Sequence, residues 1–171
     1  MPSESIDTTT LSAPAFFGKI PGHGDFISRG FTKTELKNID DWLSEWMKSC
    51  KAEWQVVFED NYRDSQPWLF SGECLTAILM PSLDRVGRLF PIFAVASAKV
   101  RVKALYDVTY SLISEPGTGD QFYDALTSIK DDGSEGSNTK VKGWFLPDEK
   151  ELALLHPFEG ENTDWVRGAL R

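Results

Sequence analysis

Two short polar stretches of the sequence hold the side chains whose types and spacing could do chemistry. They read GKIPGHGDF at residues 18–26 and PSLDRVGR at residues 81–88, and the second separates two apolar segments. His23 close to Asp25 suits a general base, and Asp25 with Asp84 would make a carboxylate pair if the two met in space. The stretches therefore have three interpretations: a catalytic loop, an ion-paired structural corner, or a docking surface.

Neither stretch completes a known catalytic or metal-binding motif. A phosphate-binding loop needs four residues between its first Gly and a Gly-Lys-Ser/Thr that opens a helix, whereas here Gly-Lys comes first. His23 and His156 are the only histidines, and neither Cys50 nor Cys74 lies at a recognisable ligand spacing from them. No serine nucleophile elbow is present either. We therefore expect no metal and no cofactor, and the residues give catalysis little support.

The arginines of these stretches suggest a structural role instead. Arg29 follows Asp25, and Arg85 and Arg88 follow Asp84. Exposed ion pairs stabilise a fold by only about 0–1 kcal/mol, whereas a partly buried Arg held by a carboxylate and carbonyls can join two loops. Our hypothesis is that Arg88 or Arg85 bridges to Asp25, with Arg88 as the brace and Arg85 as the exposed contact.

Composition narrows the class of protein. The chain has 171 residues, 18 basic against 26 acidic ones, and a formal net charge of -8, which argues against a nucleic-acid partner. Its longest apolar runs fall short of the ~20 residues that cross a bilayer. We expect residues 1–14 to be a flexible leader without a secretory signal, residues 15–171 to form one domain, and the two cysteines to be reduced thiols of a cytoplasmic protein.

Local patterns predict the elements that would position the two stretches. Residues 15–20 resemble a first strand, and Thr32 with Glu35 forms a capping box, which predicts a helix over residues 33–58. The runs PWLFSG and LTAILM resemble a hairpin turning at Gly72, and residues 89–102 a buried strand whose Pro91 belongs at an edge, a bulge or the strand start. Residues 104–115 fit a helix or a strand equally, and residues 119–132 favour a short helix.

The remaining segments complete an α/β prediction. VKGWFLP and ELALLH are strand candidates, and NTDWVRGAL is a terminal helix or extended arm. We therefore expect helices layered on a mixed sheet of about five or six strands with several antiparallel pairs.

Two motifs, GKIPGHGDFISRGF (residues 18–31) and LMPSLDRVGRLFP (residues 79–91), together resemble the TagF (ImpM) family of type VI secretion accessory proteins. The resemblance is strongest from Gly18 to about Ala98. It implies a single three-layer α/β/α sandwich around a central mixed, largely antiparallel sheet. The motif and candidate interaction residues are Gly18, Lys19, Pro21, Gly24, Asp25, Phe26, Arg29, Trp42, Trp68, Pro81, Ser82, Asp84, Arg85, Gly87, Arg88 and Pro91, and Leu43 and Phe90 also fit the pattern.

The resemblance further implies a cytoplasmic, non-enzymatic protein of a Gram-negative bacterium. Relatives of this kind restrain type VI secretion after translation, by binding the forkhead-associated scaffold protein beside a kinase and phosphatase pair. Two alternatives remain open: an enzyme or ligand-binding domain that uses the loops of Asp25, Asp84 and Arg88, and a structural component of the secretion apparatus. A peripheral association with the secretion complex is compatible with each of them.

Overall fold

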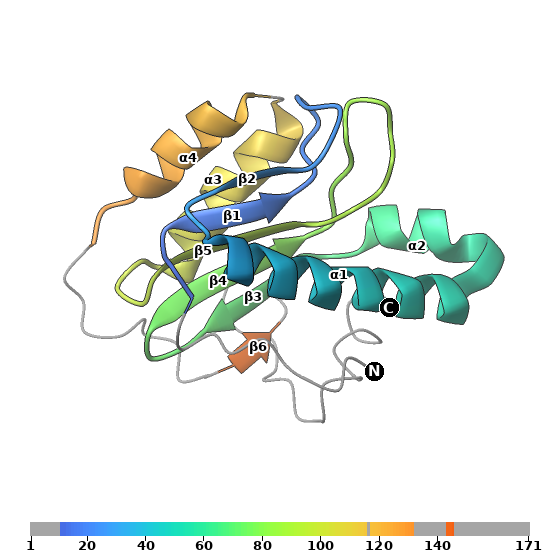
Figure 1. The fold of residues 1–171 in the computed structure, drawn as a ribbon, viewed down its shortest axis with the longest axis horizontal. Helices are drawn as coiled ribbons and strands as arrows, with labels where there is room; N and C mark the ends of the chain where they lie inside the picture. The colour runs from blue at the N-terminus through green and yellow to red at the C-terminus, as the bar shows by residue number, and fades with distance from the viewer. Residues whose placement is uncertain (1–10, 116, 132–142, 146–171) are drawn as a thin grey trace.

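A computed structural model describes residues 11–115, 117–131 and 143–145 (Figure 1). Its elements, in chain order, are β1 (Ala15–Gly18), β2 (Ile27–Arg29), α1 (Lys33–Trp54), the 3₁₀ turn η1 (Gln55–Val57), α2 (Phe58–Asp64), β3 (Trp68–Ser71), β4 (Leu75–Met80), β5 (Ile92–Ser97), α3 (Val102–Ser114), α4 (Gly119–Thr127) and β6 (Gly143–Phe145). None of the helices in these residues is long and apolar enough to span a bilayer.

Helix α1 begins where the capping box predicts. The backbone N–H of Glu35 donates to Thr32 Oγ1, and the N–H of Thr32 donates to Glu35 Oε2 at 2.6 Å, so two free helix donors are satisfied. The predicted end at residue 58 is wrong. Gln55 adopts φ 49°, which an α-helix does not allow, and the chain passes through η1 before α2 starts at Phe58.

The six strands form one sheet in the order β2-β1-β5-β4-β3-β6. Every pairing between the described strands is antiparallel, which corrects the expectation of a mixed sheet. The hairpin of β3 and β4 is confirmed, with the Gly72 N–H donating to the Leu75 carbonyl in its turn. Strand β5 lies inside the sheet, and Pro91 directly precedes its first residue, where no ladder hydrogen bond is lost.

The segment that fitted either a helix or a strand forms helix α3. The short helix expected after it is confirmed as α4, and Thr118 with Gln121 gives α4 a capping box of its own. Strand β6 lies within the predicted run VKGWFLP. The predicted ELALLH strand and NTDWVRGAL segment lie outside the described residues, as do residues 1–10 of the predicted leader. Within residues 11–14, the Ser12 N–H donates to Glu35 Oε1 at 2.6 Å and Leu11 packs against the core.

Strand residues alternate between two apolar cores on opposite faces of the sheet. Helices α1 and α2 cover the core that contains Phe17, Leu79 and Phe93, and helices α3 and α4 cover the core that contains Phe16, Ile78 and Ile92 (Figure 1). The structure thus confirms the α/β class. The end of β1, the end of β4 and the start of β5 lie at the same end of the sheet, and the two polar stretches leave the sheet there.

Candidate functional site

The two polar stretches meet at one end of the sheet. Gly18, the last residue of β1, pairs with Ile92, the first residue of β5, which in turn pairs with Met80, the last residue of β4. Residues 19–26, the first motif loop, and residues 81–91, the second motif loop, therefore emerge side by side, and together they form what we call the corner. A side chain at Gly18 is impossible here because a Cβ would lie 2.1 Å from the Pro91 carbonyl oxygen.

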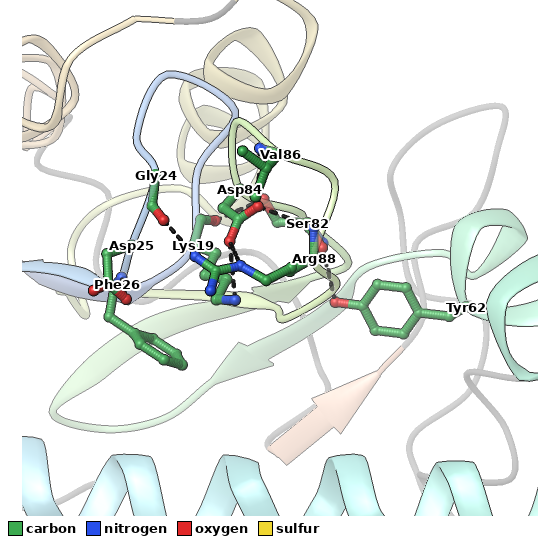
Figure 2. Close-up of polar contacts among 9 residues, drawn as sticks. All are labelled: Lys19, Gly24, Asp25, Phe26, Tyr62, Ser82, Asp84, Val86 and Arg88. Carbon is green, nitrogen blue, oxygen red and sulfur yellow. Dashed lines mark hydrogen bonds and ion pairs between the residues drawn. The ribbon is translucent and has the colours of Figure 1, made fainter.

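Asp84 is the centre of the corner. It is fully shielded from solvent, and its two carboxylate oxygens accept four hydrogen bonds (Figure 2). Oδ1 accepts from the backbone N–H groups of Val86 at 3.0 Å and Arg88 at 2.9 Å. Oδ2 accepts from Lys19 Nζ at 3.1 Å and Arg88 Nε at 2.6 Å. These four donors match the acceptor capacity of an ionised carboxylate.

The surroundings of Asp84 fix its charge state. Burial alone would raise the pKa of this carboxyl. The hydrogen bonds from the Arg88 backbone, the Lys19 ammonium, the Arg88 guanidinium and the Val86 backbone outweigh burial and hold its pKa well below the usual range. Asp84 is therefore an anion at neutral pH with every acceptor site in use, which suits neither a general base nor a nucleophile.

Lys19 is the buried counter-ion of Asp84, a role that the sequence did not reveal. Its side chain is 8% exposed, and its ammonium lies 5.0 Å from the centre of the Phe26 ring, in the position of a cation–π contact. The pair joins residues 65 positions apart. Local spacing pointed to the neighbouring arginines as partners for Asp84, and a lysine in another loop leaves no such signal.

Arg88 joins the two loops, but its partner in the first motif loop is the Gly24 carbonyl and not the expected Asp25 carboxylate. Its Nη2 donates to the Gly24 carbonyl at 2.5 Å while its Nε holds Asp84. Within the described residues, the expected ion pair between Asp25 and Arg85 or Arg88 does not form. Instead, Asp25 is exposed and accepts from the Phe26 N–H at 2.8 Å, and Arg29 pairs with Asp120 on α4. The hypothesis of a bridge to Asp25 is therefore wrong, because the short turn directs that carboxylate back to its own backbone.

Tyr62 of α2 ties the second motif loop to the helical layer. Its hydroxyl donates to the Ser82 carbonyl at 3.2 Å and accepts from the Ser82 N–H at 3.1 Å, while Ser82 Oγ donates to the Lys19 carbonyl at 2.7 Å (Figure 2). Burial raises the pKa of Tyr62 far above its usual range, so the hydroxyl stays neutral. Tyr62 was not predicted as a site residue, because its only signal in the sequence is its place four residues after Phe58 on an amphipathic helix.

His23 has a backbone-supporting role in the first motif loop. Its Nε2 accepts from the Gly119 N–H at the start of α4 at 3.3 Å, and its carbonyl accepts from the Arg85 N–H at 2.7 Å. Gly22 lies against the carbonyl of Gly117, where a Cβ would approach to 2.2 Å. The imidazole and its loop therefore connect α4 to the corner.

The other predicted site residues divide between the core and the outer surface. Trp42 and Trp68 are buried in the core that α1 covers. Gly87 has φ 88° with open space around it, so it is needed for the turn and not for a close approach. Phe26 is 46% exposed, Val86 is 70% exposed, and Arg85 makes no ion pair with a described residue. No group of three or more His, Cys, Asp or Glu side chains that could hold a metal occurs in the part of the chain that the structure describes.

Comparison with known proteins places the chain in a family. The crystal structure of PA0076 from Pseudomonas aeruginosa PAO1 is similar, with a TM-score of 0.54 and 28% sequence identity over 68% of this chain and 62% of that chain, so the match spans less than two thirds of PA0076. No curated protein matches. The model of the TagF N-terminal domain, described as type VI secretion system-associated, matches residues 15–137, which include both motif loops and the corner that they build. The chain therefore belongs to the TagF family of type VI secretion system-associated proteins.

Proposed function

We propose that this protein is a non-enzymatic, cytoplasmic accessory protein that restrains the type VI secretion system after translation, by binding the forkhead-associated scaffold protein. The observation that carries this proposal is the saturation of Asp84. A carboxylate with four internal donors and a strongly lowered pKa has no free capacity for proton transfer. The corner thus supports a binding role, in which its interior fixes a shape and its exterior meets a partner.

The exterior of the corner has the composition of a binding surface. We define the outer face of the corner as the exposed side chains of Phe26, Arg85 and Val86. Aromatic residues and arginine are enriched among the side chains that dominate protein interfaces. Arg85 carries a positive charge on a chain whose formal net charge is -8, so it favours an acidic patch on the partner.

The architecture supports this division between interior and exterior. Two apolar cores on opposite faces of the sheet favour the three-layer α/β/α sandwich that the sequence resemblance implies. In such a sandwich β1, β4 and β5 are packed on both faces, and hydrogen bonds from Lys19, Ser82 and Arg88 join the loops that these strands carry. A preformed loop surface loses little conformational entropy on binding.

The test combines secretion and binding in the host. Deletion of the gene should raise effector release, and the tagged protein should recover the scaffold in a pull-down. Arg85→Glu should weaken scaffold binding without lowering the melting temperature, whereas Lys130→Glu, an exposed charge reversal beyond the end of α4, should change neither quantity. Unchanged effector release together with no scaffold binding would overturn the proposal.

A further inference from the structure

An open cavity of about 380 Å³ lies between α2, the second motif loop and the last turn of α3. Most of its wall is apolar and consists of Pro21, Pro81, Leu83, Leu89 and Ile113. Its volume falls in the range of ordinary ligand-binding pockets and exceeds that of any single side chain. None of the roles described above for Asp84 and its partners involves this cavity.

The two uncharged polar side chains that line the cavity, Tyr62 and Ser82, already donate hydrogen bonds inside the protein. The Tyr62 hydroxyl is paired with the backbone of Ser82, and the Ser82 hydroxyl donates to the Lys19 carbonyl. A polar group placed against Tyr62 or Ser82 would lose water while the hydroxyl donors of both side chains are already in use. The interior of the cavity therefore selects an apolar occupant.

Among the described residues that line the cavity, Arg63 alone carries a charge. Its side chain is exposed, and although Glu59 and Asp60 precede it and Asp64 follows it on α2, it forms no ion pair with any described residue. A guanidinium at the mouth of an apolar cavity favours an occupant whose apolar part enters while a carboxylate stays at the rim.

The wall of the cavity is held in place before anything binds. Pro81 restricts the second motif loop at its start, and the hydrogen bonds of Asp84 and Tyr62 fix the loop on either side of Leu83. The same loop exposes Arg85 and Val86 next to the cavity. A small molecule that fits the cavity would leave these two side chains exposed, whereas the surface of a partner protein would cover them. Both features favour a macromolecular partner that inserts one anchoring side chain.

We infer that the cavity receives an apolar side chain of a partner protein and that Arg63 pairs with an acidic residue next to that side chain. The recognition element is thus a short partner segment that combines a large apolar residue with Asp or Glu. That this segment belongs to the scaffold protein rests on the proposed function. The preference for an apolar residue beside an acidic one does not.

Scaffold binding provides the first arm of the test. Ile113→Trp should narrow the cavity and Arg63→Glu should reverse the charge at its mouth, and each should weaken scaffold binding about tenfold or more, the usual loss for a central interface residue. Tyr110→Trp, one turn earlier on α3, and Lys130→Glu are the matched controls for size and for charge. Melting temperatures establish that each variant is folded. Binding within about twofold of wild type for both cavity variants would overturn the placement of the partner segment in the scaffold.

A second arm does not depend on the scaffold. A display library of short random peptides is selected on the wild-type protein and counter-selected on Ile113→Trp and on Arg63→Glu. The expected result is enrichment of peptides that combine Leu, Met, Phe or Trp with Asp or Glu and that bind neither variant. Enrichment here, combined with no scaffold binding by wild type, would refute the proposed function and keep the inference. Peptides that bind all three proteins equally, no enrichment, or a wild-type dimer in analytical ultracentrifugation that Arg63→Glu abolishes would overturn the inference.

Discussion

Asp84 and Asp25 belong to the two motif loops, and their surroundings give them opposite roles. Asp84 is sealed from solvent and accepts hydrogen bonds from a lysine of one loop and an arginine of the other. Asp25 is exposed and accepts from the N–H of the next residue. A carboxylate in a motif can therefore stabilise the fold or shape a single turn. The two roles differ in the number of hydrogen-bond donors that the tertiary structure brings to the carboxylate.

Breaking the buried ion pair at one partner should have the largest effect on stability. Asp84→Ala leaves the Lys19 ammonium and two loop N–H groups buried without their acceptor, and Lys19→Met leaves one donor of Asp84 missing. We expect Asp84→Ala to lower the melting temperature more than any other substitution proposed below. A second measure is alkylation of Cys50 in a Cys74→Ser background, because burial raises the pKa of the Cys50 thiol to about 12 and protects it until the fold opens.

The double variant Lys19→Met/Asp84→Ala serves as the control for this prediction. It removes both charges together, so it should be more stable than the sum of the two single losses implies. Additive losses would mean that Lys19 and Asp84 stabilise the corner independently, contrary to the structure.

Lowering the pH should have the second-largest effect, because acid removes the stabilisation that the Asp84 carboxylate gives to the fold. Its pKa in the folded state lies below the unfolded value of 3.8, so its stabilisation is fully present above that value and is lost as the pH falls through the lower folded pKa. Chemical unfolding as a function of pH should show this loss in wild type and a shallower one in Asp84→Asn. A residual slope is expected, because the pKa of Glu35 is also lowered by hydrogen bonds from Thr32 and Ser12 that outweigh its slight burial. Identical slopes in wild type and Asp84→Asn would contradict the strongly lowered pKa of Asp84.

Tyr62→Phe should have a moderate effect. It removes a hydroxyl that satisfies both the N–H and the carbonyl of Ser82, so a loss of about 1–3 kcal/mol in the free energy of unfolding is expected. Tyr110→Phe is the matched control, because the side chain of Tyr110 is 54% exposed and its loss of a hydroxyl should be neutral. Equal effects of the two substitutions in urea denaturation would show that the bond to Ser82 contributes nothing.

Asp25→Ala should have the smallest effect of the series. Asp25 is exposed, and within the part of the chain that the structure describes its carboxylate holds only the N–H of Phe26, so the free energy of unfolding should change by about 0.5 kcal/mol or less. A loss as large as that of Asp84→Ala would mean that Asp25 has a second partner and would remove the contrast between the two loops.

Local signals in the sequence predicted the elements and failed on long-range partners. The capping box of Thr32 and Glu35 and the turn at Gly72 act over a few residues, and both predictions were confirmed. The end of α1 was missed because Trp54 and Phe58 continue the apolar stripe across the break at Gln55. The meeting of the two motif loops was foreseen, but the bond of Lys19 to Asp84 and that of Tyr62 to Ser82 depend on strand register and helix placement, which spacing along the chain does not encode.

The central claim is that the interior of the corner gives it shape while its outer face binds. The most direct measurement is the affinity for the scaffold of Asp84→Asn and Arg85→Glu, at a temperature where amide NMR spectra show both variants folded. We predict that Asp84→Asn, although less stable, keeps the affinity of wild type to within a few-fold, and that Arg85→Glu loses about tenfold or more while retaining wild-type stability. The reverse pattern, with binding lost in folded Asp84→Asn and retained in Arg85→Glu, would contradict this account.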